Sequence, residues 1–122
     1  MFDGVDPSAE MLRLAREAGL KPQVTISAAF GCPFEGDVPL ENIEDAVRRF
    51  TQLGVSAYTI CDTTGMAYPR QVREIMRQLR DRFPQHTYTL HFHNTRGLGV
   101  ANVLAAAADG FDRFDASLGG LG

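Results

Sequence analysis

The amino-acid sequence predicts an α/β fold in which parallel strands are joined by helical crossovers. Strand-like and helix-like segments alternate along its 122 residues, and each unit takes about 30 residues, the size of a strand–helix–strand repeat. Short apolar runs rich in β-branched residues indicate the strands, and apolar residues at helical spacing indicate the helices. From this alternation we expect four parallel strands with helices between them.

The first half of the chain predicts two helices, each followed by a strand. The first helix begins at Asp6-Pro7, where the carboxylate can cap the first turn and proline needs no amide partner, and Gly19 ends it. A strand follows over residues 23–30. The second helix begins near Pro39, and a short apolar strand covers residues 57–61.

The second half repeats the same order of elements. A third helix begins at Pro69 and carries an apolar stripe with arginines on its opposite face. The third strand covers residues 87–92, and an alanine-rich helix runs from about residue 98 to residue 109. A fourth strand over residues 113–117 leads into a glycine-rich end.

Polar residues follow each predicted strand, in the runs 30–32, 62–65, 91–94 and 115–117. An open doubly wound sheet concentrates its ligand at one switch point, whereas in a barrel every strand end rings the same site. Polar residues at four successive strand ends favour a (β/α)₈ or TIM barrel. Because such a barrel takes about 250 residues, we expect about half of one: a single partial domain over residues 1–122 without the first strands and the last strand. Its exposed strand edges favour a homo-oligomer or association with another chain.

Composition excludes several classes of partner. The apolar content is 44% and the formal net charge is −3, so neither nucleic acid nor an anionic membrane surface is an expected partner. No apolar run approaches the roughly 20 residues of a membrane span. The two cysteines, Cys32 and Cys61, form no disulfide framework, and together with the lack of a visible secretory signal they favour a cytoplasmic protein.

Two histidines one residue apart are the clearest candidate ligands. His91 and His93 follow the strand-like run 87–90 and fall on one strand face, about 7 Å apart along the backbone. Two imidazoles at that spacing can converge on one metal ion at about 2.1 Å. From the residues alone, a pair of buried or solvated histidines explains the pattern equally well.

Four runs taken together resemble one enzyme family. They are Phe30-Gly31-Cys32-Pro33-Phe34-Glu35-Gly36, Asp62-Thr63-Thr64-Gly65, His91-Phe92-His93-Asn94-Thr95-Arg96-Gly97 and Asp115-Ala116-Ser117-Leu118-Gly119-Gly120-Leu121-Gly122. In this order they resemble 3-hydroxy-3-methylglutaryl-CoA lyase (HMG-CoA lyase), a member of the metal-dependent TIM-barrel lyase and synthase superfamily. The resemblance covers essentially the whole chain.

The resemblance implies a metal-dependent carbon–carbon lyase acting on an acyl-CoA substrate. His91 and His93 would bind a divalent ion, Mg²⁺ or Mn²⁺, although imidazoles alone suit zinc equally well. Asp62 and His91 would be catalytic; from the residues alone, Asp62 fits an Asx turn or a helix N-cap as well. The family's other oxygen ligands and its loop cysteine fall outside this chain, so we expect little or no lyase activity from the isolated chain.

Other polar residues carry weaker expectations. Cys61 should point away from Asp62, towards the helices, and pack there. Cys32 fits a small apolar residue better than a reactive thiolate. Asp115 and Ser117 share a strand face and can line the site or bond around it.

Asn94 and Arg96 fit either partners of the ligands or turn residues, and His86 fits a solvated position at the start of a strand.

Three alternative functions stay open. One is a Claisen-type synthase of the same superfamily that condenses acetyl-CoA with a 2-oxo acid; the loop 30–36 argues against it, and a Cys-Pro continuation after Gly122 would favour the lyase. Another is a non-catalytic half-barrel that folds by self-association. The third is an unrelated open-sheet binding domain, which would bind no divalent metal near the two histidines.

Overall fold

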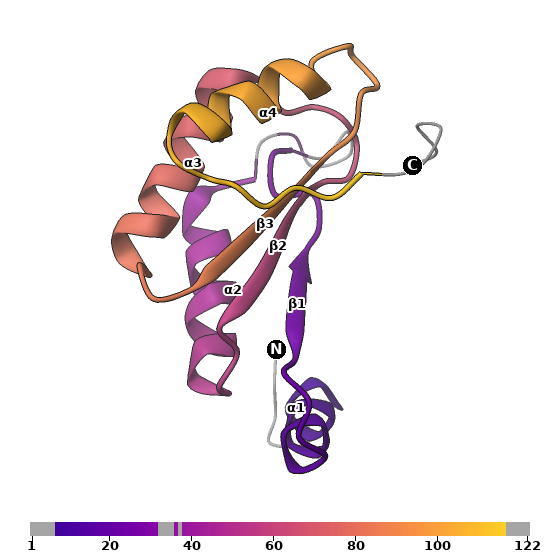
Figure 1. Cartoon of the computed structure of the whole chain (residues 1–122), viewed down its shortest axis with the longest axis vertical. Helices are drawn as coiled ribbons and strands as arrows, with labels where there is room; N and C mark the ends of the chain where they lie inside the picture. The colour runs from indigo at the N-terminus through magenta and orange to yellow at the C-terminus, as the bar shows by residue number, and fades with distance from the viewer. Residues whose placement is uncertain (1–6, 32–35, 37, 117–122) are drawn as a thin grey trace.

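The computed structural model describes residues 7–31, 36 and 38–116. Its elements in chain order are α1 (Pro7–Glu17), β1 (Gln23–Ile26), α2 (Leu40–Gln52), β2 (Ala57–Asp62), α3 (Pro69–Arg82), β3 (Thr87–Phe92) and α4 (Gly99–Ala108) (Figure 1). The helix starts predicted at Pro7 and Pro69 are confirmed, since proline lacks the amide hydrogen that a first helical turn leaves unpaired. Among the described helices, none combines the length and the apolar character that a membrane crossing requires.

The strands form a parallel sheet in the order β1-β2-β3, which confirms the predicted α/β architecture. The first strand ends at Ile26, earlier than predicted, because Ala28 adopts a left-handed conformation with φ 53° and the chain turns there. The predicted fourth strand is reduced to one parallel bridge in the described residues, between Leu90 and Phe114. Residue 117 lies outside the described residues.

The two faces of the sheet differ in chemistry. Ile26, Ile60 and Leu90 lie in register on one face, and Thr25, Thr59 and Thr89 lie in register on the other. The apolar face packs against the helices, where the fully buried side chains include Tyr58, Ile60, Val72, Met76, Leu79 and Leu90. Burying one large apolar side chain contributes about 1.5–3 kcal/mol, so this face fixes the sheet on its helices and leaves the threonine face free for polar groups.

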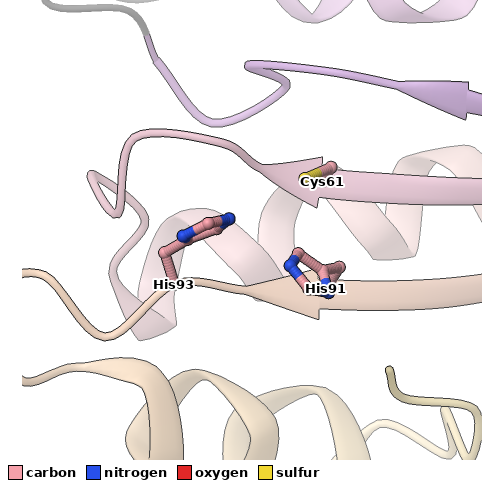
Figure 2. Close-up of side chains that lie close together, drawn as sticks. All are labelled: Cys61, His91 and His93. Atoms are coloured by element: carbon pink, nitrogen blue, oxygen red, sulfur yellow. The ribbon is translucent and has the colours of Figure 1, made fainter. Parts of the chain in front are cut away.

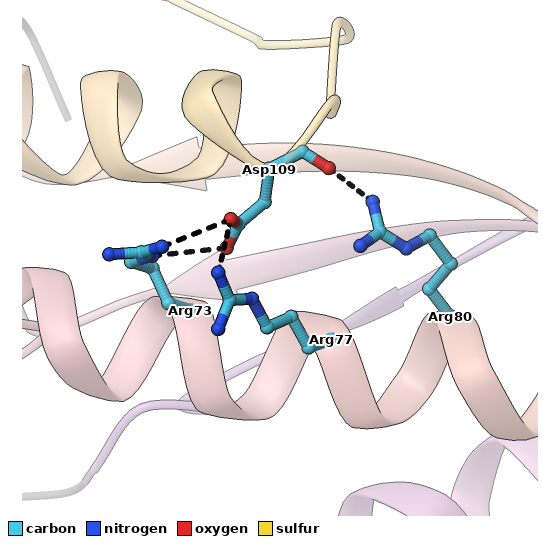
Figure 3. Close-up of polar contacts among 4 residues, drawn as sticks. All are labelled: Arg73, Arg77, Arg80 and Asp109. Atoms are coloured by element: carbon cyan, nitrogen blue, oxygen red, sulfur yellow. Dashed lines mark hydrogen bonds and ion pairs between the residues drawn. The ribbon is translucent and has the colours of Figure 1, made fainter.

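An ion-pair cluster joins α3 to the end of α4 (Figure 3). The Asp109 carboxylate, only 6% exposed, accepts hydrogen bonds from Arg73 at 3.2 and 3.3 Å and from Arg77 at 2.7 Å. Arg80 donates to the backbone carbonyl of Asp109. The hydrogen bond from Arg77 contributes most to lowering the pKa of Asp109, so the carboxylate is ionised at neutral pH and ties α4 to α3.

The expectation of a solvated His86 is wrong. The ring is half-buried, its Nε2 lies 2.8 Å from the Thr51 hydroxyl, and it stacks at 5.9 Å on Phe83 and lies 5.1 Å from the ring of Tyr58. Burial lowers the pKa of His86. This histidine therefore belongs to an aromatic cluster before β3, not to the site at the strand's other end.

Candidate metal centre

His91 and His93 lie together at the carboxyl end of β3. Their ring centroids are 5.0 Å apart with an interplanar angle of 75°, and both side chains are partly buried. Strand alternation places both on the threonine face of the sheet, away from the helices. The expected convergence of the two imidazoles is confirmed as geometry; their binding of an ion stays a prediction.

Cys61 joins the two histidines (Figure 2). It is the register partner of His91 on the neighbouring strand, and one ligand atom from each of Cys61, His91 and His93 lies within 4.8 Å of the others. The expectation that Cys61 packs towards the helices is therefore wrong. The reason is strand parity: Tyr58 and Ile60 are fully buried against the helices, so Cys61, one residue out of step with them, faces the other side.

The thiol of Cys61 accepts a hydrogen bond from the next loop. The Thr63 hydroxyl lies 3.6 Å from the Cys61 sulfur and accepts a 2.8 Å hydrogen bond from the amide of Ala28. Since the hydroxyl accepts from that amide, its single hydrogen is free to point at the sulfur. The loop after β1 thus helps to orient the cysteine on β2.

Asp62 holds the turn that follows β2. Its side chain is 1% exposed, and its two oxygens accept hydrogen bonds from the amides of Met66 at 2.9 Å and Ala67 at 3.2 Å. Burial raises the pKa of Asp62, and these hydrogen bonds, together with the charge of the nearby His93, partly oppose that rise. These bonds reach four and five residues along the chain, not the two of an Asx turn, so Asp62 holds a wider loop than expected, and its catalytic role stays a prediction.

Two further contacts hold the loops around the centre. The side-chain amide of Asn102, fully buried in α4, donates to the Ala67 carbonyl at 3.0 Å. Gly65 lies so close to Thr95 that a Cβ at position 65 would stand 2.6 Å from the Thr95 side chain. The loop after β2 and the loop after β3 therefore pack against each other beside His93.

The other polar residues considered from the sequence differ in where the structure places them. The Asn94 side chain accepts a 2.9 Å hydrogen bond from the amide of Gly99, so it acts as a turn residue that ties the loop after β3 to the start of α4. Arg96 and Asp115 are exposed. Cys32 and Ser117 lie outside the described residues.

The donor set decides which ions the centre suits. The two imidazoles provide nitrogen ligands of borderline softness, which many divalent ions accept, including the expected Mg²⁺ or Mn²⁺. A hard ion such as Mg²⁺ takes mainly oxygen ligands, whereas the third donor offered here is a sulfur. Sequence reasoning missed this sulfur, although the alternation of Tyr58 and Ile60 with Thr59 and Cys61 could have revealed which way it points.

The fold agrees with comparisons against known proteins. The HMGL-like family model matches residues 3–122, and the chain belongs to this family. It is 47% identical over 107 residues to (R)-citramalyl-CoA lyase of Chloroflexus aurantiacus, an alignment that covers 88% of this chain and 34% of that protein. It is 32% identical over 114 residues to homocitrate synthase of Sulfolobus acidocaldarius, covering 93% of this chain and 23% of the synthase.

Among solved structures, an HMG-CoA lyase from Acinetobacter baumannii in complex with coenzyme A and 3-methylmalate superposes with a TM-score of 0.86 and 43% identity. This match covers 94% of our chain and 37% of that one. The chain therefore has the fold of part of a TIM-barrel lyase and spans about a third of the length of these lyases.

Proposed function

We propose that this chain supplies the metal-binding part of a carbon–carbon lyase that cleaves 3-hydroxy-3-methylglutaryl-CoA, or a close acyl-CoA relative, to acetyl-CoA and a keto product, acetoacetate in the first case. The observation that carries the proposal is the pair of imidazoles meeting at 5.0 Å on the polar face of the sheet, at the carboxyl end of β3. In barrels of this type, that end of the strands is where catalytic groups gather.

The roles of the residues follow from their positions. His91 and His93 would hold a divalent ion, Mg²⁺ or Mn²⁺ by family resemblance. Such an ion supplies Lewis-acid polarisation of substrate oxygens. Removal of the substrate hydroxyl proton lets the carbon–carbon bond break, and the acetyl-CoA enolate is then protonated.

Asp62 and His91 are our candidates for handling these protons. The raised pKa of Asp62 suits a group that takes up a proton, and carboxyls with a shifted pKa are common in catalytic sites. Its two backbone hydrogen bonds fix the carboxyl in place beside His93. A histidine that binds an ion through one ring nitrogen keeps only the other for hydrogen bonding, so Asp62 is the stronger of the two candidates.

An acyl-CoA substrate is supported by the relatives, two of which are named for lyases of acyl-CoA compounds. The similarity to a homocitrate synthase keeps a Claisen-type condensation as the second candidate reaction. The two differ in direction: the lyase releases acetyl-CoA, whereas the synthase consumes it. Product analysis by mass spectrometry with each candidate substrate separates them.

Metal binding can be tested on the chain itself. We expect Mn²⁺ to bind to the 122-residue chain and binding to be lost in His91→Gln and His93→Gln, as measured by titration calorimetry or by the paramagnetic resonance of free Mn²⁺. His86→Gln is the matched control, because the third histidine lies in the aromatic cluster before β3. Equal binding in all three variants would refute the assignment of the ligands.

Catalysis needs the remainder of a barrel, so we expect the chain alone to release no acetoacetate. A chimera in which the 107 aligned residues replace their counterparts in the Chloroflexus lyase supplies that remainder. We expect this chimera to cleave the lyase's own substrate, and His93→Ala to slow cleavage by more than about 100-fold, since disturbing even an outer partner of a ligand costs 10- to 100-fold. A folded but inactive chimera would contradict the proposed function.

Self-association is a second proposal, favoured by apolar side chains on the outside of the molecule. Met11, Leu14 and Leu20, in and after α1, are 69%, 52% and 64% exposed. Met11 and Leu14 are neighbours on the helix surface, and grouped exposed apolar side chains are typical of interaction surfaces. We infer that α1 and the neighbouring edge of the sheet pair with a second polypeptide. Light scattering should show a species larger than one chain, and Leu14→Glu should reduce it; a monodisperse monomer would argue against pairing.

A further inference from the structure

We propose that Cys61 is a third protein ligand and that Cys61, His91 and His93 together form a binding site for a borderline ion such as Zn²⁺. This inference rests on the two histidines of the proposed function and adds a sulfur ligand to them. It predicts that the centre prefers a different ion from the hard Mg²⁺ expected of the family.

The backbone places the three donors correctly. Cys61 and His91 are register partners on adjacent parallel strands, where neighbouring backbones lie about 4.8 Å apart, and His93 follows on the same side (Figure 2). One ligand atom from each of the three lies within 4.8 Å of the others. Around tetrahedral zinc the donors stand about 3.5 Å apart, given bonds of about 2.3 Å to sulfur and 2.1 Å to nitrogen. Side-chain rotations that move each donor by less than about 1 Å therefore complete the site.

The sulfur is already oriented by a neighbouring group. The Thr63 hydroxyl lies 3.6 Å from the Cys61 sulfur. The amide of Ala28 donates a 2.8 Å hydrogen bond to the same hydroxyl and so holds it in place. Hydrogen bonds of this kind to a ligand atom are typical of metal centres, where they hold the ligand's direction. A cysteine that merely filled space would not need a donor aimed at its sulfur.

No carboxylate of the described residues competes for the third position. Asp62 is the nearest acidic neighbour in the sequence, but both of its oxygens already accept hydrogen bonds from backbone amides. Within the described part of the chain, Cys61, His91 and His93 are the one group of three such donors close enough to share an ion. A set of two imidazoles and one sulfur favours Zn²⁺ or Co²⁺ over Mg²⁺. On binding, the thiol gives its proton to solvent and the thiolate binds the ion.

The test uses Co²⁺ as a spectroscopic substitute for Zn²⁺ in the complete 122-residue chain. We expect Co²⁺ to produce a sulfur-to-metal charge-transfer band in the near ultraviolet, and Zn²⁺ to displace it. Cys61→Ser should abolish the band and weaken Zn²⁺ binding by more than about 10-fold. Cys32→Ser is the matched control and should retain the band.

X-ray absorption on the unaltered chain loaded with Zn²⁺ gives a reading that needs no variant. One sulfur at about 2.3 Å and two nitrogens at about 2.1 Å support the proposal; a shell without sulfur overturns it. A band that survives in Cys61→Ser overturns it too. Mn²⁺ binding that depends on the histidines, combined with a sulfur-free cobalt spectrum, refutes the cysteine ligand and leaves the proposed function intact. A Cys61-dependent band together with an inactive chimera supports the site and refutes the lyase.

Discussion

Replacing Gly65 by alanine tests whether the two loops beside the metal centre are packed as tightly as described. Gly65 has φ +72° and Gly97 has φ +75°, so both occupy the left-handed region and an alanine at either position costs about 1 kcal/mol, or somewhat more, in conformation. The surroundings differ. A Cβ at position 65 would stand 2.6 Å from the Cβ and hydroxyl of Thr95 and 3.2 Å from its backbone nitrogen, whereas a Cβ at position 97 meets nothing within 4 Å.

The difference between the two variants isolates the contact. Forcing an extra carbon into a filled space costs about 1–3 kcal/mol, so Gly65→Ala should be less stable than Gly97→Ala by that amount. For a domain of this size the gap corresponds to roughly 4–12 °C in the midpoint of thermal unfolding, measured by circular dichroism. Because the displaced Thr95 is two residues from His93, Gly65→Ala should also weaken Mn²⁺ binding, while Gly97→Ala should leave it unchanged. Equal unfolding midpoints for the two variants would refute the close approach of the loops.

Three further changes probe the supports of the centre. Asp109→Asn should lower the thermal unfolding midpoint at pH 7, whereas the exposed control Asp112→Asn should not. The pKa of Asp109 is lowered in the folded state, so the carboxylate stabilises the fold above its unfolded pKa of about 3.9. This stabilisation should vanish as the pH falls through the pKa of the folded state. Asn102→Ala removes the donor to the buried Ala67 carbonyl and should cost about 1–3 kcal/mol in chemical unfolding; an unchanged midpoint would contradict that bond. Tyr88→Phe removes a buried hydroxyl whose single hydrogen lies within reach of two backbone carbonyls, and it should cost about 1–2 kcal/mol. Since burial raises the pKa of this phenol, the parent chain should show no titration of Tyr88 near its ordinary value of about 10.

Much of the architecture could be predicted from local sequence. Apolar spacing and prolines gave the helices, and α3 begins at Pro69 as predicted. Runs of β-branched and aromatic residues gave the strands, and β3 has the predicted bounds of residues 87–92. These features depend on a residue and its near neighbours, which the sequence displays directly.

Two of the failures involve partners distant in sequence. The early end of β1 depends on Ala28, whose amide bonds to Thr63, 35 residues away. The buried state of His86 depends on Thr51, which lies on another element. Neither contact leaves a local pattern, because both arise only after the helices have packed on the sheet.

The orientation of Cys61 was a different kind of failure, because the necessary signal was present. Assigning Asp62 to the site forced its neighbour Cys61 to the helix side. The apolar residues Tyr58 and Ile60 indicate the opposite, since a sheet covered by helices on one face turns its apolar side chains towards them. Strand alternation assigned from the buried apolar residues Tyr58 and Ile60, and not from Asp62, predicts the orientation of Cys61 that the structure has.

The same parity explains how the core determines the chemistry of the centre. Tyr58 pairs in register with Tyr88, and Ile60 with Leu90, and all four side chains are buried on the apolar face. A slip of one residue between β2 and β3 would expose one member of each pair, so apolar burial holds the register against slipping. That register sets Cys61 opposite His91. The meeting of a thiol and an imidazole on the polar face is therefore a consequence of apolar packing on the other face. A substitution that shifts the register, such as Ile60→Ala combined with Leu90→Ala, should disturb metal binding without touching a ligand.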